Sequence, residues 1–173
     1  MQLVTERSPP GRRPLYTPEE RQRRDASAWT WVQGVLAPLQ FLVFLVSLGL
    51  VLRFLWTGQG QAAAEVSIVV KTLVLYTIMV TGCIWEKVVF GQYLFAPAFF
   101  WEDVFSMLVL ALHTAYLVAL LGQWMGPRPL MGLALAAYAA YVINAAQFLI
   151  KLRAARLEAA RLAPGQAQEG LPA

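Results

Sequence analysis

Four long apolar stretches, almost free of charge, alternate with shorter polar segments along the chain. They cover residues 29–52, 66–85, 104–121 and 130–150. A helix rises about 1.5 Å per residue, so stretches of this length cross a hydrocarbon layer about 30 Å thick. The pattern therefore predicts an all-α, polytopic integral membrane protein with four transmembrane helices.

One charged side chain, Lys71, lies inside these stretches, near the start of the second. A lysine in such a position can extend its ammonium group to the lipid headgroups. We therefore expect Lys71 to reach the membrane surface, and we do not count it among the candidate site residues.

The connection between the second and third stretches, residues 86–103, differs from the other two, which are short and rich in Gly or Pro. It is apolar, carries charges only at its ends, and is too short to cross the membrane and return. This composition predicts an aromatic interfacial or re-entrant segment, although an ordinary aromatic belt at the membrane surface explains it equally. Its aromatic residues are Phe90, Tyr93, Phe95, Phe99, Phe100 and Trp101.

Composition supports the membrane assignment and excludes several classes of function. Of the 173 residues, 58% are apolar and 14% charged, whereas soluble domains average about 45–50% and about 25%. A disordered or nucleic-acid-binding protein is excluded. The single Cys and single His are too few for a disulfide, a zinc site, an iron–sulfur cluster or a bis-histidine haem. We expect no metal site of the chain's own, and we expect Cys83 to act as a small packing residue.

Basic residues set the expected orientation. Six arginines precede the first stretch and four basic residues follow the fourth, whereas the two loops on the opposite side hold only Arg53 and Arg128. Cytoplasmic segments are enriched in Lys and Arg, so both termini are expected to be cytoplasmic. The chain then divides into a basic arm (1–28), a four-helix membrane domain (29–153) and a cytoplasmic tail (154–173).

Three carboxyl groups bracket the aromatic connection and are the first candidates for chemistry. Glu86 begins it, and Glu102 and Asp103 end it, so all three are expected at one membrane face. A structural interpretation is equally open: Glu102 and Asp103 can offset the dipole of the third helix, and Glu86 can pair with Lys87.

His113 follows Glu102 by eleven residues, and eleven steps of about 100° return to within about 20° of the starting face. Glu102, Ser106, Val109 and His113 therefore form one stripe that runs into the membrane. An imidazole there is costly unless it is paired. A structural histidine and a functional one both fit this position.

Uncharged polar residues inside the stretches predict hydrogen bonds between helices. Gln33 and Gln40 share one face of the first stretch, Thr77 and Thr81 lie one turn apart on the second, and Asn144 and Gln147 lie on the fourth. Bonds between helices are expected for Asn144 and Gln147, whereas the Gln and Thr pairs can bond backbone carbonyls or orient a water or the polar edge of a ligand. In a bilayer such side chains hydrogen-bond across helices, although a threonine can instead bond a backbone carbonyl of its own helix.

Four long runs carry a family resemblance: RPLYTPEERQRRDASAWT, VQGVLAPLQFLVFLVSLGLVLR, IMVTGCIWEKVVFGQYLFAPAFFWEDVFSM and LALHTAYL. They resemble the 3-vinyl bacteriochlorophyllide hydratases of anoxygenic phototrophs, over about residues 13–156. The resemblance implies a hydro-lyase of bacteriochlorophyll biosynthesis that adds water to the 3-vinyl group of a chlorophyllide or bacteriochlorophyllide, giving a 3-(1-hydroxyethyl) product. It implies no cofactor and a place in the bacterial inner membrane.

For such a reaction we expect a carboxylic acid to protonate the terminal vinyl carbon, so that the cation forms beside the ring and water captures it. Glu86 and Glu102 are the expected acid/base pair, with Asp103 as the nearest substitute. His113 is a candidate ligand for the substrate's magnesium or a proton relay. The residues expected to bind the ring are Trp85, Tyr93, Phe99, Phe100 and Trp101.

Two other functions remain open on the sequence. A membrane protein that carries chlorophyllide unchanged needs the same aromatic pocket but no acid pair. A scaffold without a ligand needs only end-of-helix charges. The expected partners are the substrate, the lipid membrane and other enzymes of bacteriochlorophyll biosynthesis.

Overall fold

Four of the helices are long and apolar enough to cross a membrane: α2 (Ala28–Thr57), α3 (Gln61–Phe90), α4 (Phe100–Leu121) and α5 (Pro127–Leu162). A short helix, α1 (Pro18–Ala26), precedes them. The structure, a computed structural model, describes residues 15–162, so residues 1–14 of the predicted arm and 163–173 of the predicted tail lie outside it. The predicted all-α, four-span class is confirmed, and the chain is a multi-pass membrane protein.

The helices extend beyond the apolar stretches because local capping, not hydrophobicity, determines where they end. The Ser27 side chain accepts a hydrogen bond from the Trp29 amide and begins α2. Gly58 and Gly91 end α2 and α3 with φ of 72° and 84°, a left-handed conformation that glycine adopts without a steric penalty. The connection between α3 and α4 is therefore reduced to residues 91–99. Whether it lies in the membrane interface stays a prediction.

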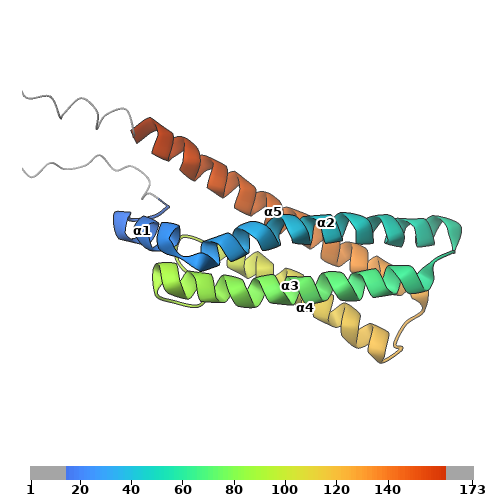
Figure 1. Ribbon diagram of the computed structural model, residues 1–173. Helices are drawn as coiled ribbons and strands as arrows, with labels where there is room; N and C mark the ends of the chain where they lie inside the picture. Colours follow the sequence, from blue (N-terminus) through green and yellow to red (C-terminus); the bar gives the residue numbers. More distant parts are fainter. Residues whose placement is uncertain (1–14, 163–173) are drawn as a thin grey trace, which may run out of the picture.

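The bundle consists of two helical hairpins. Helices α2 and α3 pack along their length, as do α4 and α5, whereas the two hairpins contact each other less extensively. Figure 1 shows α1, the start of α2 and the end of α3 at one end of the bundle, with the C-terminal part of α5 extending past it. We call this the terminal end; both hairpin turns lie at the opposite end.

Polar side chains join some of the helices: the expected bond is present for Asn144, whereas Gln147 Oε1 has no partner among the described residues. Gln33 Nε2 donates to Thr81 Oγ1 at 2.8 Å, and Thr81 also donates to a backbone carbonyl of its own helix. Asn144 Nδ2 donates to Ser106 Oγ at 2.8 Å, joining α5 to α4. Since lipid offers no hydrogen-bonding partners, these bonds determine which faces of the helices meet.

Lys71 contradicts its prediction. Its side chain is fully buried, with Nζ 3.9 Å from the centre of the Tyr141 ring and 5.8 Å from that of Tyr138. Nζ has no hydrogen-bond partner among the described residues. The prediction that it reaches the headgroups is wrong because α3 begins at Gln61, ten residues before Lys71. That places Lys71 about 15 Å inside the helix, beyond the reach of its side chain.

A hydroxyl network near Lys71 tests how much such bonds stabilise the bundle. Ser47 Oγ contacts both Ser67 Oγ at 2.7 Å and Tyr138 Oη at 2.5 Å, which joins three helices. We expect Ser47→Ala to lower the free energy of unfolding by about 1 kcal/mol, because it leaves the buried Tyr138 hydroxyl without a partner. Thermal unfolding of the purified chain in detergent measures this. Ser67→Ala keeps the Ser47–Tyr138 bond and should cost less; equal losses would contradict a central role for Ser47.

Candidate active site

The loop at residues 91–99 brings two carboxyl groups together. Its Phe95 amide donates to Asp103 Oδ2 at 2.7 Å, and the next amide, that of Ala96, donates to Glu86 Oε2 at 3.4 Å. Phe95 has a φ of 59°, a left-handed conformation that costs a non-glycine residue about 1 kcal/mol. The loop is therefore strained at Phe95. Its two successive N–H groups donate to side chains at the end of α3 and the start of α4.

The carboxyl groups of Glu86 and Asp103 lie side by side, because two successive loop amides each hold one of them, and they are close enough to interact. Both residues are buried, with 6% and 4% of their surface exposed. Two carboxylates in contact in a poorly hydrated site repel each other, so the favourable state of such a pair holds one shared proton. A pair of this kind can donate a proton at one oxygen and accept a proton at another.

The two carboxyl groups face opposite helix ends. Glu86 lies in the last turns of α3, and Asp103 lies in the first turn of α4. The helix dipole favours a negative charge at an N-terminus and disfavours it at a C-terminus. The shorter hydrogen bond from Phe95 adds to this difference. The surroundings therefore favour the charge on Asp103 and the proton on Glu86.

Glu102, the predicted partner of Glu86, is engaged elsewhere. Its Oε2 forms an ion pair with Lys151 Nζ of α5 at 2.5 Å. Neighbouring helix positions differ by about 100°, so Glu102 faces α5 while Asp103 faces the end of α3. Lys87 does not pair with Glu86 either, since its Nζ donates to the Gly91 carbonyl. The structure brings together Glu86 and Asp103, the substitute named from the sequence.

Two of the predicted ring-binding residues belong to a closed aromatic cluster. Phe99 packs against Trp85, Phe90 and Phe148 with ring centres 5.7–5.9 Å apart, and Tyr16 stacks on Phe90 at 5.8 Å. We call these five residues the aromatic cluster. Phe148 stacks on Phe99, whereas Phe90 and Phe99 meet Trp85 nearly at right angles and Trp85 is only partly buried.

Tyr16 anchors the segment before α1 to this cluster. Burial raises the pKa of its hydroxyl, and the Arg24 guanidinium, 4.6 Å from the ring centre, opposes that rise. The other predicted ring-binding residues, Tyr93, Phe100 and Trp101, are 60%, 43% and 66% exposed and lie on the outer surface. The predicted aromatic floor is therefore divided between an inner cluster and an outer face.

His113 lies on the predicted stripe but far from the acid pair. Glu102, Ser106, Val109 and His113 are all buried, as the spacing predicts. Ten residues of α4, about 15 Å, separate His113 from Asp103. His113 Nδ1 lies 2.8 Å from the Val109 carbonyl, which can only accept, so Nδ1 carries the hydrogen and Nε2 presents a lone pair. Among the described residues, Nε2 has no partner. That His113 binds the substrate's magnesium or relays a proton stays a prediction.

The sequence did not reveal three parts of the site. The amides of Phe95 and Ala96 are backbone groups, which leave no trace in residue type. Cys83 lies three residues before Glu86 and is close enough to interact electrostatically with both Glu86 and Asp103. The signal in the sequence that could have revealed Cys83 is its spacing of three residues from Glu86, which places both side chains on nearby faces of the same helix. Within the described residues, no three His, Cys, Asp or Glu side chains gather as metal ligands.

Comparisons with known proteins agree on one family. The family model described as 2-vinyl bacteriochlorophyllide hydratase matches residues 16–154. A protein of that name from Cereibacter sphaeroides is 73% identical over 147 residues, which cover 84% of this chain and 91% of the relative. A namesake from Rhodobacter capsulatus is 71% identical over 152 residues, covering 87% and 88%. No solved structure matches the chain.

Substitutions in the Glu102–Lys151 ion pair test whether it stabilises the packing of α4 against α5. Lys151→Met leaves the buried Glu102 carboxylate without its cation, and we expect a loss of about 2 kcal/mol in unfolding free energy. The matched change Lys87→Met removes an exposed ammonium and should cost far less. Adding Glu102→Gln to Lys151→Met should restore part of the loss. Thermal unfolding in detergent measures all three, and an equal effect of the two lysine changes would contradict this role.

Proposed function

Because the chain belongs to the 2-vinyl bacteriochlorophyllide hydratase family, we propose that Glu86 and Asp103 are the acid and base of its reaction. The chain is a hydro-lyase of bacteriochlorophyll biosynthesis that hydrates the vinyl group of a bacteriochlorophyllide. The carbon numbered 2 in this name is the carbon numbered 3 above. The observation that carries the proposal is that two buried carboxyl groups accept hydrogen bonds from successive amides of the 91–99 loop, which places them side by side.

In this mechanism Glu86 is the acid. It transfers its proton to the terminal vinyl carbon, and the remaining carbon, attached to the conjugated ring, becomes a cation. A water oxygen bonds to that carbon, and Asp103 removes a proton from the water. The product carries a 1-hydroxyethyl group, and the pair again holds one proton, now on Asp103, which returns to Glu86 through their shared hydrogen bond. The helix ends favour this assignment of roles.

The aromatic residues then take two roles. Trp85 and Phe99, which pack in the aromatic cluster and lie close to Glu86 and Asp103 in sequence, limit the access of bulk water to the acid pair. A dry site strengthens the electrostatic effect of Asp103 on the developing cation. Tyr93, Phe100 and Trp101 contact the membrane surface and the edge of the substrate. Transfer of pigment to other enzymes of the pathway stays a prediction.

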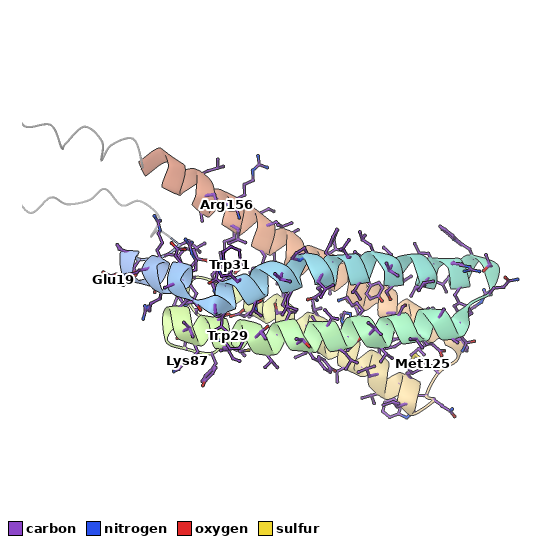
Figure 2. The ribbon with its side chains drawn as sticks, in the orientation of Figure 1. Glu19, Trp29, Trp31, Lys87, Met125 and Arg156 are labelled. Carbon is purple, nitrogen blue, oxygen red and sulfur yellow. The ribbon has the colours of Figure 1, made fainter. Side chains whose placement is uncertain are left out.

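The proposed location is the bacterial inner membrane, with both termini in the cytoplasm. Arg21, Arg23 and Arg24 of α1 lie at the terminal end. Figure 2 shows Lys87 and Arg156 at this end and Met125 at the other. The imbalance of basic residues supports a cytoplasmic terminal end. The acid pair would then receive water and protons from the cytoplasmic side.

Two conservative substitutions test the acid pair. We expect Glu86→Gln and Asp103→Asn each to lower the hydration rate by about 10²–10⁴-fold, because each removes one proton-transfer group while keeping shape. The assay adds 3-vinyl chlorophyllide to membranes that contain the chain and make no pigment. Chromatography and mass spectrometry then measure the gain of one water.

Glu102→Gln is the matched control, since it changes the neighbouring carboxylate that the structure places in an ion pair. It should retain turnover within about tenfold of the original chain. Near-normal product from both Glu86→Gln and Asp103→Asn would contradict the assignment. Pigment that binds unchanged to the original chain would favour the carrier function.

Reporter fusions test the orientation. We expect a fluorescent protein that matures only in the cytoplasm to be active at either terminus, and alkaline phosphatase, which needs an oxidising compartment, to be inactive there. The same phosphatase inserted between α4 and α5, after Gln123, should be active. Phosphatase activity at either terminus would contradict the proposed orientation.

A further inference from the structure

A groove opens on the outer surface between α3 and α4. It has a volume of about 340 Å³, and its lining is Tyr76, Met79, Val80, Leu110 and Thr114. Figure 1 shows α4 running at an angle away from α3 towards the end opposite the termini. The side chain of Val80 is 61% exposed at this surface. The groove therefore faces the hydrocarbon layer, where an apolar molecule enters sideways from the bilayer.

The groove leads to the acid pair along the same two helices. Met79 precedes Glu86 by seven residues, and Leu110 follows Asp103 by seven. Seven residues are about two helical turns, so each pair shares a helix face and is separated by about 10 Å. Cys83 lies between on α3, is partly exposed, and interacts electrostatically with both carboxyl groups. Side chains of one continuous strip thus join the groove to Glu86 and Asp103.

We propose that this groove binds the macrocycle of the substrate, with the vinyl group directed past Cys83 to Glu86 and Asp103. The inference rests on the proposed function. A flat tetrapyrrole matches the distance between the groove and the acid pair. The lining is almost entirely apolar, and the end farther from the acid pair has an exposed polar bridge, Tyr76 Oη to Thr114 Oγ1 at 2.8 Å. Thr114 Oγ1 donates to the Leu110 carbonyl, so Tyr76 is the donor in this bridge. By turning away from Thr114, the Tyr76 hydroxyl can donate to a carbonyl on the rim of the macrocycle, a bond that a lipid acyl chain cannot make.

The aromatic cluster is less suited to the macrocycle than the groove, because its rings pack on one another. The space around His113 is also less suited, since His113 and Lys71 are fully buried within the bundle. The groove between α3 and α4 is open to the surface and shares both helices with the acid pair. It also explains why the two hairpins contact each other less extensively than the helices within each hairpin.

Binding is measured first, with the full-length Glu86→Gln chain in phosphatidylcholine vesicles and 3-vinyl chlorophyllide as the probe. Val80→Trp and Leu110→Trp fill the groove, and each should weaken pigment binding by at least about tenfold. Val70→Trp and Leu108→Trp are matched controls, since these residues are exposed on the same two helices but do not line the groove. The controls should bind as the parent does.

Turnover is measured next, with Glu86 restored. Cys83→Phe narrows the passage from the groove to the acid pair, so it should lower the hydration rate by at least about tenfold while pigment still binds. Equal binding by the groove variants and their controls would overturn the proposal and show that the groove holds only lipid. Loss of binding in Cys83→Phe would also overturn it, since the ring would then lie over Cys83.

Failure of the proposed function gives a different result. If the original chain binds pigment without hydrating it, and Val80→Trp and Leu110→Trp weaken that binding, the groove is correct and the acid pair is wrong. If the original chain hydrates the pigment while the groove variants bind and react as their controls do, the acid pair stands and the groove proposal fails.

Discussion

Two backbone hydrogen bonds, from Phe95 to Asp103 and from Ala96 to Glu86, hold the end of α3 against the start of α4. The rest of the site depends on them. They bring the carboxyl groups into contact, rotate α4 so that Glu102 meets Lys151, and position Phe99 within the aromatic cluster. Further along, α3 and α4 are joined by the Tyr76–Thr114 hydrogen bond, and the groove opens beside it.

The sequence predicts the helices well because lipid imposes a simple rule: apolar side chains outside, polar groups inward and paired. The same rule predicts the buried stripe from Glu102 to His113 and the bond made by Asn144. It does not distinguish Glu102 from Asp103, which are adjacent and chemically alike. Their roles depend on the rotation of α4, and that rotation is fixed by a loop backbone and by Lys151, 48 residues after Asp103.

Family membership and geometry answer different questions about this chain. Family membership identifies the reaction, since relatives more than 70% identical carry the hydratase name. It does not state which groups perform it. Geometry selects two carboxyl groups by burial and contact, and it gives them unequal surroundings at opposite helix ends. A hydration needs this inequality, because one group must release a proton to carbon while the other takes a proton from water.

The buried Lys71 bears on the order in which the bundle is assembled during synthesis. The rings that contact its ammonium group, Tyr138 and Tyr141, belong to α5, which leaves the ribosome after α3 and α4. Until α5 arrives, α3 carries a cation in the membrane without those rings, and a lone cation at that depth is costly. The first hairpin therefore cannot settle at its final depth alone. The packing of α5 against α3, rather than the insertion of α3 itself, fixes the final position of the first hairpin.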